Sequence, residues 1–261
     1  MAATDFVDVT EVAGEPISSE QLARLWHRYL WALEYCRGRE IVEAACGTGP
    51  GLGLLAEAGR SVVAGDVSAA MVQIAQEQYA GRIPVERFDA EALPFASNSK
   101  DVVILFEALY YLPHPDRFVA ECKRVLRPGG MVLIATANAD LPDFNPSPHS
   151  NQYFGAAQLD AWLRAAGFSV NLFGYMPIDS LSLRQRVLRP VKRTAVSLGL
   201  MPRTMRGKRL LKRLVFGSPV TMPSELTGTR PSYAPPLRLR AGERDTRHKV
   251  IYAVARLPAD G

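Results

Sequence analysis

Hydrophobic and polar positions along this chain follow two different periods. Apolar residues recur at helical spacing over residues 18–37, behind a capping-box pattern at Ser18 and Gln21. Short apolar runs typical of buried strands then alternate with helical patterns. The predicted strands cover residues 39–45, 61–66, 84–88, 101–106, 131–136 and 168–173, and the predicted helices between them cover residues 50–58, 69–79, 116–126 and 156–166.

This alternation predicts an α/β fold, with a mostly parallel sheet covered by helices on both faces. In such sheets ligands bind at the carboxyl ends of the strands, so the loops after the strands are where function is expected. A last apolar run at residues 249–257 predicts a seventh strand, separated from the sixth by a long segment. We therefore expect a core of residues 1–177 and 248–261, and an insert of residues 178–247 that lies over the site.

The loop after the first predicted strand contains two closely spaced glycines. The sequence EAACGTG at residues 43–49 joins strand to helix, and its glycines permit backbone conformations and close ligand approach that a Cβ would obstruct. No Gly-Lys-Ser/Thr follows, which excludes a P-loop, and Leu52 stands where the dinucleotide fingerprint needs its third glycine. Taken alone, this loop fits a plain turn as well as a nucleotide site.

Acidic residues end the next two predicted strands. Asp66 ends the second strand, where a carboxylate can accept hydrogen bonds from two ribose hydroxyls. Asp89 follows the third strand, where a carboxylate can accept a hydrogen bond from an adenine amino group. With the glycine loop, these acids favour an adenosine-binding site.

Four segments resemble motifs of the class I S-adenosylmethionine-dependent methyltransferases, in particular the small-molecule enzymes of methyltransferase type 11. EAACGTG is similar to the family's first motif, GDVS at residues 65–68 to its second, and FDAEALPF at residues 88–95 to its third. The stretch LFEALYYLPHPDRFVAECKRVLRPGG at residues 105–130 is the most specific match. The resemblance implies a Rossmann-like sheet of seven strands in the order 3-2-1-4-5-7-6 and S-adenosyl-L-methionine as cofactor. Ala45 departs from the glycine that is usual in the first motif, a small residue in place of another.

The resemblance also implies which residues bind the cofactor. Glu43 would orient the loop and the methionine ammonium, Asp66 would hold the ribose, and Asp89 would contact the edge of the adenine. Tyr29, on the leading helix, lies in a segment similar to one that closes over the cofactor's carboxylate, and it fits core packing equally well. The remaining implied cofactor-binding residues are Ala45, Gly47, Gly49, Val67, Met71, Ala90, Phe106 and Glu107.

Methyl transfer needs a nucleophile held in line with the methyl group in a dry pocket. A hydroxyl acceptor also benefits from a general base, whereas an unprotonated amine needs less help. The candidate catalytic residues are His149, in the loop after the fifth strand, and Tyr110 and Tyr111, after the fourth. A lone loop histidine is also a common structural or surface residue. The four histidines show no ligand spacing, so we expect no metal site.

Positive charge is concentrated in the insert. Residues 178–247 contain 16 Lys and Arg against 4 Asp and Glu, whereas the rest of the chain contains 15 against 22. Lys208, Arg209, Lys212 and Arg213 fall largely on one face of a predicted helix, opposite apolar residues. Three interpretations remain open: a solvated helix face, a binding surface for an anionic acceptor, and peripheral contact with an acidic membrane. Few aromatic residues accompany these cations, so nucleic acid is not expected as a partner.

The chain contains three cysteines, none in a metal-binding or disulfide-type spacing, and no apolar run long enough to span a membrane. We therefore expect a cytoplasmic enzyme that methylates a small-molecule acceptor, on oxygen ahead of nitrogen, in a biosynthetic or glycan-tailoring pathway. The alternative is an inactive cofactor-binding protein that docks a partner enzyme or a membrane through the insert.

Overall fold

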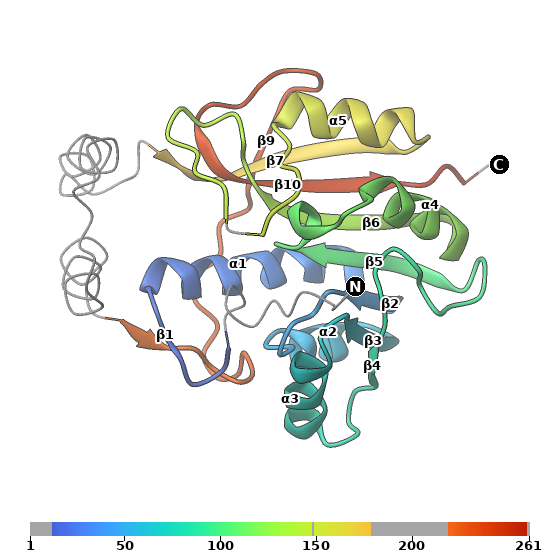
Figure 1. Cartoon of the computed structure of the whole chain (residues 1–261), viewed down its shortest axis with the longest axis vertical. Coiled ribbons are helices and arrows are strands. Elements are labelled where there is room, and N and C mark those ends of the chain that lie inside the picture. The colour runs from blue at the N-terminus through green and yellow to red at the C-terminus, as the bar shows by residue number, and fades with distance from the viewer. Residues whose placement is uncertain (1–11, 148, 179–218, 260–261) are drawn as a thin grey trace.

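The fold is built on one eight-stranded sheet with helices on both faces (Figure 1). A computed structural model describes residues 12–147, 149–178 and 219–259. The sheet has the order β4-β3-β2-β5-β6-β10-β7-β9. The first five strands in this order are parallel to one another, and β10 runs antiparallel to both of its neighbours, β6 and β7. Its strands are β2 (Glu40–Ala44), β3 (Ser61–Asp66), β4 (Val85–Arg87), β5 (Lys100–Phe106), β6 (Leu126–Ala137), β7 (Ser169–Pro177), β9 (Leu237–Arg238) and β10 (His248–Arg256).

The α/β prediction is confirmed, but the predicted number of strands is wrong. An eighth strand, β9, pairs antiparallel with β7 through Phe173 and Gly174. In the predicted strand order, β7 would be an edge strand with unpaired backbone N–H and C=O groups. β9 pairs with part of that edge. A two-residue strand carries too little periodicity to be recognised in a sequence. β6 also begins earlier than predicted, because Leu126 already pairs with Lys100 ahead of a register irregularity.

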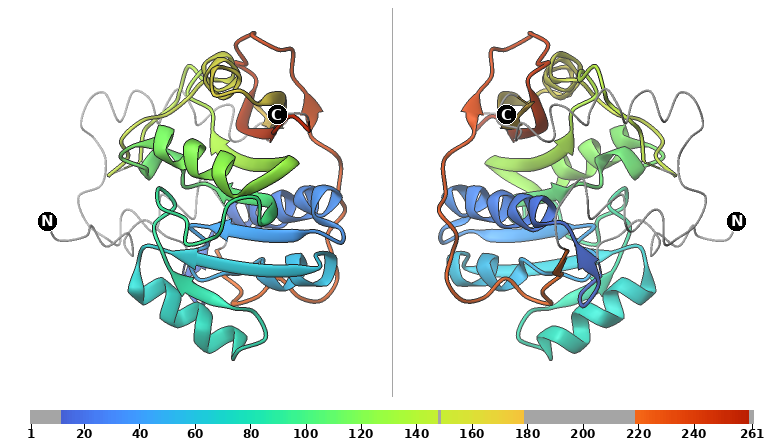
Figure 2. Two further views of the ribbon diagram at one scale, coloured as in Figure 1. Left: turned by 90° about the vertical axis from the view of Figure 1, so that its right-hand side faces the viewer. Right: turned by 90° about the vertical axis from the view of Figure 1, so that its left-hand side faces the viewer.

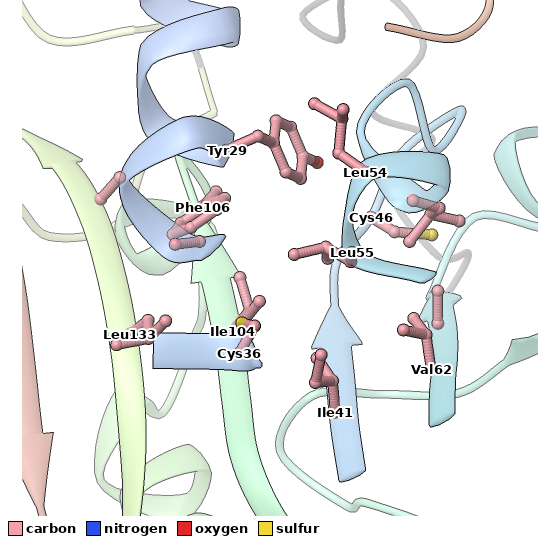
Figure 3. Packing of buried hydrophobic residues seen from close by; sticks show 14 of the residues in the cluster. Tyr29, Cys36, Ile41, Cys46, Leu54, Leu55, Val62, Ile104, Phe106 and Leu133 are labelled. Carbon is pink, nitrogen blue, oxygen red and sulfur yellow. The ribbon is translucent and has the colours of Figure 1, made fainter. Parts of the chain in front are cut away.

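Alternate strand residues face two separate cores. Ile41, Ile104 and Leu133 belong to the core under α1 (Ser19–Cys36), α2 (Leu52–Ala58) and α3 (Ala69–Tyr79). Val42, Leu105 and Ile134, each one position along, belong to the core under α4 (Pro115–Val125) and α5 (Ala156–Ala165). This period of two follows from the pleat of a strand. In the first core, Tyr29 points from α1 toward Leu54 on α2 (Figure 3).

The helix α1 begins at the predicted capping box. The Ser18 hydroxyl accepts a hydrogen bond from the Gln21 N–H (3.1 Å), and the Gln21 side-chain oxygen accepts one from the Ser18 N–H (2.9 Å). Just before this cap, β1 (Pro16–Ile17) pairs antiparallel with β8 (Val220–Thr221) in a separate two-stranded sheet. The entrance to α1 is therefore tied to a segment near the other end of the chain.

The described part of the predicted insert, residues 219–247, runs along the α1 side of the sheet from the level of α2 and α3 to β9 (Figure 2). The predicted basic helix with Lys208, Arg209, Lys212 and Arg213 lies outside the described residues. Among the described residues, no helix is long and apolar enough to cross a membrane.

Candidate active site

A cavity of about 430 Å³ opens where four neighbouring strands end. The segments that follow β2, β3, β4 and β5 line it, together with residues of α1 and one residue of the segment after β8. This position agrees with the rule that parallel α/β sheets bind ligands at the carboxyl ends of their strands. The lining residues are Gln21, Arg24, Arg28, Ala45, Cys46, Gly47, Thr48, Pro50, Asp66, Val67, Phe88, Asp89, Ala90, Phe106, Glu107, Ala108, Tyr110, Tyr111, Leu112, Pro113 and Met222.

The glycine loop after β2 is held in a left-handed conformation. Ala45, Gly47 and Gly49 have φ angles of 55°, 57° and 72°. The Tyr79 hydroxyl of α3 donates a hydrogen bond to the Gly49 carbonyl (2.6 Å), and a Cβ at Gly49 would collide with the Leu52 side chain at 2.7 Å. Glycine at position 49 is thus required both by its backbone angle and by the space around it.

Asp66 connects this loop to the end of β3. Its carboxylate accepts hydrogen bonds from the Gly47 N–H and the Ser68 N–H, each at 2.9 Å. Burial raises the pKa of the Asp66 carboxyl, and the backbone donors at Ser68 and Gly47 oppose that shift. The carboxylate lines the cavity beside Val67, and Asp89 lines it from the end of β4. These side chains form what we call the β3–β4 end of the cavity.

Beneath the glycine loop lies a buried acid, Glu43. The Tyr29 hydroxyl donates a hydrogen bond to Glu43 Oε1 (2.6 Å), and no described residue bonds to Glu43 Oε2. Burial raises the pKa of Glu43 to about 7, although the hydrogen bond from Tyr29 and the charge of Arg28 lower it. Glu43 therefore holds a proton at a pH at which an exposed glutamate would have lost it.

The opposite end of the cavity, which we call the α1–β5 end, contains an ion pair. Arg24 of α1 lies 2.6 Å from Glu107 Oε1, and the Tyr110 hydroxyl donates a hydrogen bond to Glu107 Oε2 (3.2 Å). Glu107 has a φ of 51°, unusual for a residue with a side chain, and such strain is concentrated at functional sites. The Tyr111 hydroxyl shares a hydrogen bond with Ser147 (2.9 Å), which attaches the loop after β6 to this end.

Three buried polar atoms around the glycine loop have no hydrogen-bond partner among the described residues: Glu43 Oε2, Thr48 Oγ1 and Arg28 Nε. Buried polar atoms in folded proteins are almost always satisfied, so unpartnered ones beside a cavity indicate a ligand. Thr48 and Arg28 line the cavity, and Glu43 lies directly below the loop. A ligand that carries an ammonium and a carboxylate as well as an adenosine fits this set of groups, and S-adenosylmethionine has all three.

Most residues expected at the site meet in this one cavity. Of the predicted residues, those that line it are Ala45, Gly47, Asp66, Val67, Asp89, Ala90, Phe106, Glu107, Tyr110 and Tyr111. Tyr29, Glu43, Gly49 and Met71 are buried behind its wall rather than in it. His149 is exposed, with a φ of 65°, on the loop after β6 and outside the cavity lining. Its role as a base stays a prediction.

Among the lining residues that were not predicted as site residues, Arg24, Arg28 and Met222 come from outside the loops that follow β2, β3, β4 and β5. Arg24 and Arg28 lie one turn apart on α1, and their i, i+4 spacing was a signal that the apolar stripe of the same helix obscured. Met222 has no sequence signal, because only the tertiary fold brings it to the cavity.

Comparison with known proteins agrees with this geometry. Residues 42–134 match the family described as "Methyltransferase domain". The chain is 36% identical over 153 residues to a probable S-adenosylmethionine-dependent methyltransferase of Mycolicibacterium smegmatis, which covers 56% of each protein. It is 34% identical over 137 residues to a demethylmenaquinone methyltransferase of Renibacterium salmoninarum, which covers 52% of this chain and 56% of the relative.

Among solved structures, the complex of the Haloferax volcanii Trm112 methyltransferase activator with a methyltransferase contains a chain of the same fold. The TM-score is 0.58 at 18% identity, with 92% of both chains covered. The aligned part of the chain spans about half the length of the curated relatives it matches. From the motifs, the sheet and these likenesses together, residues 42–134 form a class I S-adenosylmethionine-dependent methyltransferase domain.

Proposed function

We propose that this protein transfers the methyl group of S-adenosylmethionine to a small-molecule acceptor, on oxygen ahead of nitrogen. The observation that carries the proposal is the single cavity into which Asp66, Asp89 and the glycine loop open at one end and Glu107 and Tyr110 at the other. The first end has the groups that adenosine needs. The second supplies polar groups where an acceptor can be oriented.

The cofactor's adenosine is assigned to the β3–β4 end. Asp66 accepts hydrogen bonds from the ribose hydroxyls with the oxygen lone pairs that the two backbone N–H donors leave free. Val67, whose side chain is 37% exposed, packs on the adenine, and Asp89 accepts from the adenine amino group.

The cofactor's amino-acid part is assigned to the glycine loop and α1. The guanidinium of Arg28 binds the carboxylate, because its Nε is buried with no partner in the described part of the chain and the planar fork of arginine suits a carboxylate. Glu43 lies below the loop, and an ammonium placed near it favours its ionised form, so that the carboxylate charge then holds the ammonium in place. The cofactor supplies an electrophilic methyl group, and the chain has to hold the acceptor in line with it and exclude water.

At the acceptor end, Tyr110 and Glu107 can hold the proton that a hydroxyl acceptor loses. Burial raises the pKa of the Tyr110 phenol, and the nearby Glu107 raises it further, so the phenol keeps its proton at neutral pH. In this state Tyr110 donates to Glu107 and can accept a hydrogen bond from an acceptor hydroxyl, so a proton taken from that hydroxyl would displace the phenol's own proton onto Glu107 Oε2. Tyr111 and His149 are the other candidates for this proton, as proposed from the sequence.

Transfer of radiolabel tests the proposal. The purified chain is incubated with methyl-labelled S-adenosylmethionine and panels of hydroxylated, amine-bearing and anionic small molecules, and label is followed into the acceptor. We expect transfer to one acceptor class, and S-adenosylhomocysteine to inhibit it. Cofactor binding without transfer to any panel would favour an accessory protein. Absence of cofactor binding by calorimetry would contradict the proposal.

A further inference from the structure

We infer that Met222 is a cofactor-positioning residue, carried to the cavity by a strap of residues 219–226 that Glu225 anchors. The inference rests on the proposed function and adds a third segment of the chain to the cofactor site. Met222 lines the cavity and is 2% exposed, although the segment that carries it lies far along the sequence from the motif residues.

Backbone hydrogen bonds hold the strap on both sides of Met222. The Met222 N–H donates to the Glu15 carbonyl (2.8 Å), and the Met222 carbonyl accepts from the Gly14 N–H (2.9 Å), next to the β1–β8 pairing. Further along, the Leu226 N–H donates to the carbonyl of Pro50, the residue that follows the glycine loop (2.7 Å). The strap therefore crosses from the entrance of α1 to the glycine loop.

This crossing fixes which part of the ligand Met222 meets. The residues assigned to adenosine lie at the ends of β3 and β4, whereas the strap bonds to the residues before α1 and to Pro50, and α1 contributes Arg28 to the cavity lining. Met222 is thus placed against the amino-acid end of the cofactor. Its flexible, polarisable thioether side chain is suited to close packing on an irregular ligand surface.

Glu225 anchors the strap to the helices that support the glycine loop. Its carboxylate accepts hydrogen bonds from Gln78 of α3 (3.3 Å) and from Arg82 in the turn that follows α3 (2.7 Å). Its other oxygen lies so close to Gly53 of α2 that a Cβ there would collide with it. The carboxylate is therefore fixed between α2 and α3.

The same anchor reaches the glycine loop through aromatic and hydrogen-bond contacts. The Arg82 guanidinium lies over the Tyr79 ring, 5.1 Å from its centroid. The Tyr79 hydroxyl in turn donates to the Gly49 carbonyl (2.6 Å) and accepts from the Gly53 N–H (3.3 Å). Strap and glycine loop thus share one support, so a ligand that orders the loop will also order the strap.

Cofactor binding to the full-length chain tests the inference without knowledge of the acceptor. S-adenosylhomocysteine is titrated by calorimetry, and its dissociation rate is measured by stopped flow. We expect Met222→Ala to raise the Kd about tenfold, mainly through faster dissociation, because a buried apolar contact is lost. Met222→Leu, which keeps the volume, should restore binding, and Ser224→Ala, an exposed strap residue, should match the wild type.

A second variant keeps the test decisive if Met222→Ala fails to fold. Glu225→Gln removes the charge of the anchor and keeps Met222, and we expect dissociation about threefold faster. Hydrogen exchange of the Met222 and Leu226 amides should slow when wild-type protein binds S-adenosylhomocysteine, and slow less in Glu225→Gln.

The outcomes separate this inference from the proposed function. Wild-type protein that binds the ligand, with folded Met222→Ala and Glu225→Gln variants that bind it equally well, would overturn the role of the strap alone. Wild-type protein that binds neither S-adenosylmethionine nor S-adenosylhomocysteine would overturn the proposed function, and this inference with it.

Discussion

The two ends of the cavity are built in different ways. At the β3–β4 end, Asp66 and Asp89 follow directly from the strands that precede them, and the backbone of each strand sets the direction of its acid. At the α1–β5 end and under the strap, Arg24, Arg28 and Met222 come from elements that only tertiary packing brings together. The first end is specified locally, whereas the second depends on the integrity of the whole fold. Variants and ligands that act on one end alone can measure this difference.

The largest expected effect concerns Glu43, which couples the glycine loop to pH. Its pKa is about 7 in the fold against an ordinary value of 4.5, because burial disfavours the charge. A carboxyl with a raised folded pKa adds full stability below its unfolded pKa and loses it as the pH rises through the folded pKa. From about pH 4.5 to above 7, we expect the free energy of unfolding to fall by ~3 kcal/mol relative to Glu43→Gln.

Urea denaturation at several pH values measures this difference, and parallel pH profiles for the two proteins would contradict it. Calorimetry in buffers of different ionisation enthalpy provides a second measurement. A cofactor ammonium placed near Glu43 should lower its pKa, so binding near pH 6.5 should release a proton in the wild type and not in Glu43→Gln.

The next effect is on the adenosine. Asp66→Ala should weaken binding of S-adenosylhomocysteine about 30-fold, or ~2 kcal/mol, because the ribose loses a charged hydrogen-bond acceptor. Glu86→Ala, which removes an exposed acid on the neighbouring strand, is the matched control. A calorimetric Kd unchanged in Asp66→Ala would remove the ribose assignment.

A smaller effect is expected from comparing two ligands, one of which contacts both ends of the cavity and the other only the β3–β4 end. Methylthioadenosine has the adenosine of the cofactor and lacks its amino-acid part. We expect Arg28→Met to weaken S-adenosylhomocysteine about tenfold and to leave methylthioadenosine unchanged, whereas Asp66→Ala should weaken both. Equal losses for both ligands in Arg28→Met would show that Arg28 acts on the fold rather than on the carboxylate.

The smallest effect is expected at His149. Its side chain is exposed and outside the cavity lining, so His149→Ala should change the cofactor Kd less than twofold. Label transfer in this variant is then compared with Tyr110→Phe, which removes the hydroxyl bonded to Glu107. A fall in turnover at unchanged cofactor affinity would identify His149 as the base, and wild-type turnover would leave that role to the tyrosines and Glu107.

Local sequence signals predicted much of the fold, because the same apolar periods and capping residues form the helices and strands of the structure. The helix over residues 69–79 and the strand over residues 61–66 have the predicted bounds, and the Ser18 capping box forms as expected. The short edge strand β9 escaped prediction, since two residues carry no periodicity and their pairing with β7 is a long-range contact. For the same reason Met222 could not be placed from the sequence, although Asp66 could.

The two-stranded β1–β8 sheet has a practical consequence for N-terminal truncation of the protein. Removing the residues before α1 would delete the strand that pairs with Val220 and Thr221, and would so remove one of the attachments that hold Met222 at the cavity. We expect a shortened variant to keep its melting temperature and still bind the amino-acid part of the cofactor less tightly, so ligand affinity, rather than thermal stability, shows whether these residues are dispensable.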